Sequence, residues 1–71
     1  MTAKEGVKYL LEKVPQDEPI FILRGRDTLA PSIVLQWSLQ AQEAGVGVKK
    51  VGGAIKVATE MMVWKEKRLP T

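Results

Sequence analysis

The chain has 71 residues, 45% of them apolar, and a net charge of +3, which fits one small globular domain over residues 1–71 and excludes a disordered chain. It contains neither Cys nor His, so disulfides and the usual zinc and transition-metal sites are excluded, and we expect no metal and no cofactor. The N-terminus lacks the layout of a signal peptide, and no apolar run approaches the ~20 residues that span a bilayer, so we expect a cytoplasmic protein with no membrane contact.

The positive charge is concentrated near the C-terminus. Residues 48–71 contain six Lys or Arg and two Glu, a net charge of +4, whereas residues 1–18 contain three Lys and four acidic residues. This asymmetry favours an anionic partner such as a nucleic acid, a nucleotide or an acidic protein surface. The simpler alternative is a solvated helix face with a charged tail.

The first predicted element is a helix from about residue 3 to residue 14. Thr2 and Glu5 have the spacing of a capping box, and apolar residues follow at helical intervals. Pro15 ends the helix, because the residue before a proline avoids helical dihedral angles.

A short extended segment is predicted at about residues 20–24. Its apolar run, Ile20 to Leu23, is rich in β-branched and aromatic side chains and lies between Pro19 and Gly25. Because a lone strand leaves its backbone groups unpaired, the segment either pairs with its copy in another subunit or crosses the core without a ladder. Gly25 is expected to supply unusual backbone dihedral angles at the corner that follows.

Two further helices complete the prediction. The second runs from about Pro31 to Ala44, with Gly45 as its C-terminal stop. The third is expected from Val48 to about Lys67, with Pro70 just beyond its end. The fold class is therefore mainly α, a small three-helix domain with one extended segment between helices 1 and 2.

Gly52 and Gly53 make the start of the third helix ambiguous. If the helix contains them, each costs about 1 kcal/mol relative to Ala. Alternatively the loop extends to Gly53 and the helix begins at Ala54. The first alternative is favoured because Val51 and Ile55 then share one apolar face with Ala58 and Met62.

No catalytic residue is predicted, and we expect a protein that is not an enzyme. Without His or Cys, acid–base or nucleophilic catalysis would depend on carboxylates, Lys or Tyr9. Glu60 and Glu66 are six residues apart, which would put them on different faces of a helix.

Two groups of residues are candidates for binding an anion. Lys49 and Lys50 lie beside Gly52 and Gly53 near a helix start, although these glycines also suit close helix packing. Arg24 and Arg26 alternate on the extended segment and so could point to opposite faces. One of them could bind phosphate or carboxylate, and the alternative is an intrachain pair with Asp27 or Glu18.

The partners expected from these features are further copies of the chain and either an anionic small molecule or another protein. A domain of this size buries only about 60% of its unfolded surface, so we expect a homo-oligomer. A charge of +3 and the lack of a helix-turn-helix pair argue against duplex nucleic acid. Phe21, Met61 and Trp64 are the candidate residues of a protein interface.

The segment DEPIFILRGRDTLAPSIVLQW (17–37), together with the later MMVW (61–64), resembles small proteins of phage and prophage genomes, most of them uncharacterised. The resemblance covers most of the expected fold and carries over no functional residues. It implies a context in which short proteins inhibit a host enzyme or sequester a defence signal. We therefore predict a binding protein that holds a nucleotide-type signal as a homo-oligomer. The alternative is an inhibitor or adaptor that docks on a host protein through an apolar and basic surface.

Overall fold

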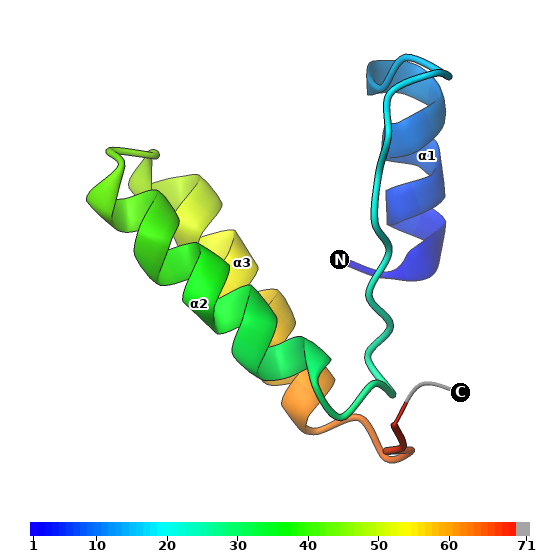
Figure 1. Ribbon diagram of the computed structural model, residues 1–71, viewed down its shortest axis with the longest axis vertical. Helices are drawn as coiled ribbons and strands as arrows, with labels where there is room; N and C mark the ends of the chain where they lie inside the picture. Colours follow the sequence, from blue (N-terminus) through cyan, green and yellow to red (C-terminus); the bar gives the residue numbers. More distant parts are fainter. Residues whose placement is uncertain (70–71) are drawn as a thin grey trace.

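The computed structural model describes residues 1–69, which contain three α-helices: α1 (Ala3–Lys13), α2 (Ala30–Glu43) and α3 (Val48–Met62) (Figure 1). The mainly helical, three-helix fold class is therefore confirmed. Pro70, expected beyond the last helix, lies outside the described residues. Among residues 1–69, no helix combines the length and the apolarity needed to cross a bilayer.

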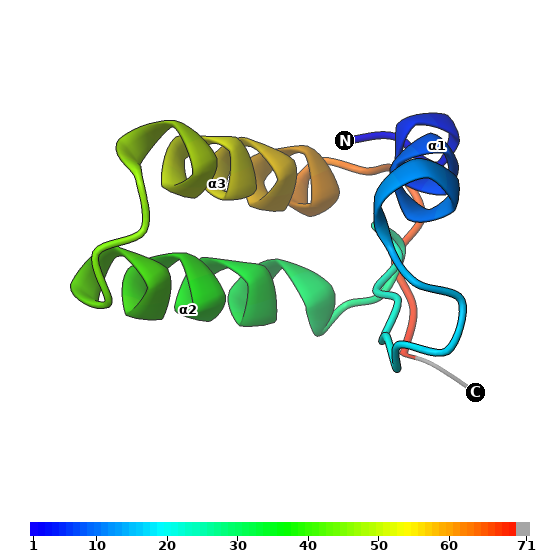
Figure 2. The ribbon, with the colours of Figure 1, turned by 90° about the horizontal axis from the view of Figure 1, so that it is seen from above.

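The α2–α3 pair forms the packed part of the molecule. The two helices run side by side as a hairpin, while α1 stands apart at one end of it (Figures 1 and 2). The buried apolar side chains are all small, namely Ala30, Ala41, Val51 and Ala58. Ser38 is also buried and donates its hydroxyl hydrogen to the Val34 carbonyl at 2.9 Å. Small side chains allow the helix backbones to approach closely, but they bury little apolar area.

The α1 helix forms for local reasons and buries none of its residues. The Thr2 hydroxyl accepts from the Glu5 N–H at 3.3 Å, and a Glu5 carboxylate oxygen accepts from the Thr2 N–H at 2.9 Å. This confirms the predicted capping box. The return segment, residues 14–23, then runs back along α1 (Figure 1).

Gly45 ends α2 as predicted. Its φ of +88° lies in the left-handed region that glycine favours. The N–H of Val46 donates to the Ala41 carbonyl at 2.9 Å, and that of Gly45 to the Gln42 carbonyl at 3.1 Å. These bonds satisfy carbonyls at the helix end in the manner of a Schellman motif.

The start of α3 at Val48 settles the ambiguity in favour of a helix that contains Gly52 and Gly53. The end of α3 was predicted wrongly, because the helix stops at Met62 and not near Lys67. The Lys67 amino group instead folds back and donates to the carbonyls of Met61 and Gly25. Beyond Met62 the Trp64 N–H donates to the Met61 carbonyl at 3.3 Å, three residues back, and this tighter turn ends the helix.

The segment at residues 20–24 is extended but forms no strand within the described chain. It does not cross the core, since the Phe21 side chain is 87% exposed. The expectation for Gly25 is also wrong, because Gly45 is the glycine with positive φ. A Cβ placed at Gly25 would lie 3.7 Å from Met61 Cγ and 3.9 Å from Trp64 Cβ, which is ordinary van der Waals contact.

A junction joins this extended segment to the C-terminal end of the described chain. The Arg68 N–H donates to the Arg26 carbonyl at 2.9 Å, and the Thr28 N–H donates to the Arg68 carbonyl at 3.1 Å. The two bonds form one isolated parallel bridge between Asp27 and Arg68. The junction therefore places two basic segments, more than 40 residues apart in sequence, side by side.

Candidate functional site

A groove of about 250 Å³ lies at this junction, at the end of the molecule near α1. Residues 21–24 and 26–27 form one wall, and residues 68–69 form the other. The lining consists of three arginines, one aspartate and four apolar side chains: Arg24, Arg26, Arg68, Asp27, Phe21, Ile22, Leu23 and Leu69. We call it the arginine groove.

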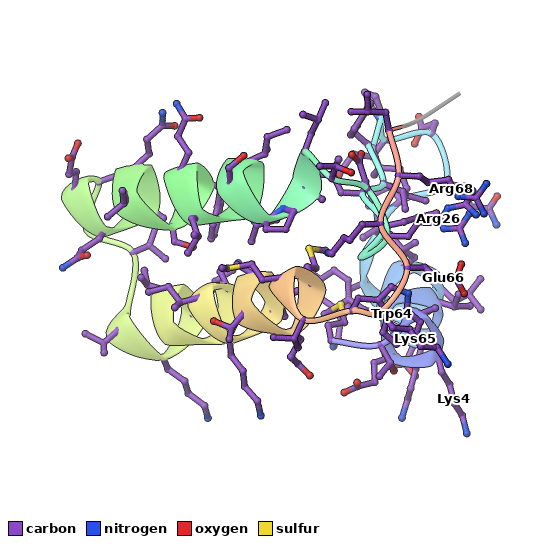
Figure 3. The ribbon with its side chains drawn as sticks, turned by 90° about the horizontal axis from the view of Figure 1, so that it is seen from below. Lys4, Arg26, Trp64, Lys65, Glu66 and Arg68 are labelled. Carbon is purple, nitrogen blue, oxygen red and sulfur yellow. The ribbon has the colours of Figure 1, made fainter. Side chains whose placement is uncertain are left out.

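The three guanidinium groups are close enough to affect one another. Arg26 is half-buried, and its partial desolvation lowers its pKa, as do the nearby charges of Arg24 and Arg68. Figure 3 shows the side chains of Arg26 and Arg68 extending in the same direction, away from the hairpin. The alternation of residues 24 and 26 therefore does not keep them apart, because both arginines line the same groove.

No carboxylate neutralises these arginines at salt-bridge distance within residues 1–69, where the sole ion pair joins the N-terminal amino group to Glu60 at 3.7 Å. The alternative of a pair with Asp27 or Glu18 is thus not realised. Asp27 has another role, since its Oδ1 accepts from the Leu29 N–H at 2.8 Å, just before α2. Asp27 lines the groove and the charge of Glu66 acts on Arg26, but three guanidinium groups outnumber these two carboxylates, so a net positive charge remains for a ligand.

The apolar part of the groove faces solvent. Phe21, Ile22 and Leu69 are all exposed, and Phe21 and Ile22 lie directly before the arginines in the chain. An apolar wall next to three guanidinium groups suits a ligand that combines an anionic group with a flat or apolar group.

The second anion-binding candidate lies elsewhere. Lys49 and Lys50 are in the first turn of α3, and Gly52 and Gly53 follow on its exposed surface. The 15-residue helix is about 22 Å long, and its start lies at the end of the hairpin away from α1 (Figure 2). One chain therefore does not bring these four residues together with Arg24 and Arg26.

The glycines of α3 pack against nothing. A Cβ added at Gly52 or Gly53 would meet no atom within 4 Å, counted outside the helix's own backbone. The alternative that they permit close helix packing within the chain is thus wrong. Because no atom of the described chain covers these glycines, a ligand has room to approach them closely, as the sequence predicted.

The proposed interface residues lie near the junction but differ in exposure. Met61 is half-buried against Gly25, whereas Trp64 is 53% exposed beside Lys65 (Figure 3). Phe21 belongs to the arginine groove itself. Met61 therefore supports the junction, and Phe21 and Trp64 present apolar surface.

Sequence reasoning missed Arg68 as a site residue. Its only signal was membership of the basic C-terminal stretch, and nothing in the spacing relates it to Arg24 or Arg26. The backbone bonds of the junction create that relation. Arg68 is consequently the residue that turns a basic turn into a groove with two walls.

A second groove, of about 370 Å³, is a poorer anion site. It is lined by Thr28, by residues of α2, by Met62 at the end of α3 and by Lys67, which is its one cationic lining residue. The Lys67 amino group is already bonded to two backbone carbonyls. Within residues 1–69, no group of three or more acidic side chains is placed to hold a metal ion.

Comparison of the chain with protein families, with curated proteins and with solved structures gave no match.

Proposed function

We propose that this protein is a non-enzymatic binding protein that holds a nucleotide-type anionic ligand in the arginine groove. The observation that carries the proposal is the convergence of Arg24, Arg26 and Arg68 without a carboxylate partner among residues 1–69. Guanidinium groups bind phosphate oxygens through paired N–H donors, and mutual repulsion between arginines is relieved when an anion binds.

The size and lining of the groove narrow the ligand class. At about 250 Å³ the groove lies just below the roughly 300–1,000 Å³ of typical small-molecule sites. It suits one phosphate with its attached nucleoside better than a large ligand. Phe21 supplies an aromatic face on which a base can stack. The resemblance to phage proteins fits the sequestration of a host signal, in the host cytoplasm and by a homo-oligomer.

Calorimetric titration against mononucleotides, linear and cyclic dinucleotides and inorganic phosphate tests this proposal. We expect binding that weakens between 50 and 300 mM salt, because partly exposed charges are screened. Arg68→Ala should weaken it about 10- to 100-fold, the range expected from loss of 1.5–3 kcal/mol in hydrogen bonds to a charged group.

The double variant Lys49→Ala with Lys50→Ala is the matched control, because it removes two positive charges from the far end of α3. It should bind the ligand with less than a threefold change in affinity. Loss of binding in this variant, with Arg68→Ala unaffected, would move the site to the start of α3. Failure of every ligand at millimolar concentration would refute nucleotide binding.

A second candidate function is docking on a host protein as an inhibitor or adaptor. The exposure of Phe21 and Trp64 next to a basic groove favours it, since aromatic side chains and arginines dominate interface energies. A defined host protein whose binding is lost in Trp64→Ala and retained in Arg68→Ala would support this function over ligand binding.

A further inference from the structure

The described chain exposes far more surface than a folded monomer of its mass should. Its accessible surface is 6184 Å², whereas a compact monomer of 7.9 kDa is expected to expose about 4,400 Å². Its radius of gyration is 12.9 Å, compared with about 11 Å for a compact 71-residue domain. The excess of about 1,800 Å² is roughly twice the area that each partner buries in a standard stable interface.

Part of this excess lies on the arm, which we define as α1 and the return segment, residues 3–23. The arm projects from the end of the α2–α3 hairpin (Figures 1 and 2). Six of its large apolar or aromatic side chains are exposed: Val7, Tyr9, Leu11, Ile20, Phe21 and Ile22. The helix α1 has 11 residues and no buried side chain, and isolated helices of that length are marginal in water. The arm therefore lacks the packing that would hold it folded.

We propose that a second copy of this chain packs against the arm through the exposed side chains of α1, namely Val7, Tyr9 and Leu11. The inference rests on the homo-oligomer part of the proposed function and is independent of its ligand. The excess area falls in the class of obligate homodimers, in which each chain completes the core of the other.

Charge also favours the arm as the contact between copies. Residues 3–23 contain three lysines and four acidic residues, a net charge of −1. Two copies meeting there suffer little repulsion, in contrast to a contact between the C-terminal regions, which carry +4 each. A contact at α1 leaves Phe21 and Ile22, which line the arginine groove, outside the interface.

Because the chain contains no Cys, a single introduced cysteine is the one thiol that an alkylating reagent can modify. Leu11 is 82% exposed on the arm, and Val48 is 89% exposed at the start of α3. In the single variants Leu11→Cys and Val48→Cys, the rate of thiol alkylation reports whether each position is covered. We expect the Leu11→Cys rate to fall at least about 10-fold as protein concentration rises from nanomolar to tens of micromolar, while the Val48→Cys rate stays constant.

Sedimentation of the unmodified protein provides the second measurement. We expect an assembly at 10 µM, and Leu11→Gln should weaken it at least about 10-fold, the range expected for removal of one buried leucine from an interface. Val48→Gln is the matched control and should not weaken it. Circular dichroism at equal concentration verifies that each variant keeps the helical hairpin.

The outcomes of these experiments distinguish a failure of the arm contact from a failure of the homo-oligomer. A wild-type protein that sediments as a monomer at 10 µM overturns both the arm contact and the homo-oligomer. An assembly that persists in Leu11→Gln, with unchanged alkylation of Leu11→Cys, overturns the arm contact alone. Neither result affects ligand binding, which Arg68→Ala tests separately.

Discussion

Replacement of both α3 glycines by alanine tests whether this helix surface is used by a partner. Gly52 and Gly53 lie in the interior of a 15-residue helix and are exposed. A Cβ at either position meets no atom within 4 Å. Each replacement should therefore stabilise the folded chain by about 1 kcal/mol through helix propensity alone. For both together this corresponds to a rise in melting temperature of roughly 8–16 °C in a domain of this size.

Thermal unfolding followed by circular dichroism measures the change, at equal protein concentrations because assembly shifts the midpoint. Gly45→Ala is the control, because it should change the melting temperature in the opposite direction. Its φ of +88° is strained for any residue with a Cβ, so it should destabilise by about 1 kcal/mol. If Gly52→Ala with Gly53→Ala leaves the melting temperature unchanged or lowers it, the glycines contact something that one isolated chain does not show. A stabilised variant that loses nucleotide binding would place the ligand on α3.

Two further predictions concern the helix ends. The hydrogen bonds from the Thr2 backbone N–H and hydroxyl lower the pKa of Glu5 below its ordinary value of 4.5, so their stabilisation of α1 is present above that value and declines as pH falls through the lowered pKa. Far-UV circular dichroism should show this loss of helix in the wild type and not in Glu5→Gln, whose side chain does not titrate. Lys67→Met keeps the aliphatic stem but removes the hydrogen bonds to the Gly25 and Met61 carbonyls, and urea unfolding should show a loss of about 1–2 kcal/mol, whereas an unchanged midpoint would mean that these bonds contribute nothing.

The elements that the sequence predicted well are those governed by local signals. The Thr2–Glu5 spacing and the position of Gly45 each depend on residues within one helical turn, so pattern alone located both helix ends. The end of α3 could not be located in this way. Beyond that end the Lys67 amino group reaches the Gly25 carbonyl, 42 residues away in sequence, and no periodicity records such a contact.

The residues of the candidate site also divide into those that a local pattern identifies and those that only a tertiary contact brings together. Arg24 and Arg26 stood out because two charges flank a glycine in a short turn. Their relation to Arg68 depends on a single backbone bridge, which is too short to produce the alternating pattern of a strand. Conversely, Lys49 and Lys50 matched a local anion-binding pattern, yet the length of α3 separates them from the arginines. Local chemistry identified residues, whereas their grouping required tertiary structure.

The weak core of the chain links its stability to its binding. Four small apolar side chains and one serine fill the hairpin interior, so the free energy of unfolding should lie at the low end of the range for small domains. The arginine groove depends on that same fold, since the junction bonds hold its two walls together. A ligand at 100 times its dissociation constant would add about 2.7 kcal/mol to the free energy of unfolding, which is a large share of the small value expected for the unliganded chain. Ligand binding at the groove should therefore raise the melting temperature of the wild type by roughly 10–20 °C. In Arg68→Ala, with its 10- to 100-fold weaker affinity, the same ligand concentration adds only about 0.4–1.4 kcal/mol, so the rise should be at most about half as large.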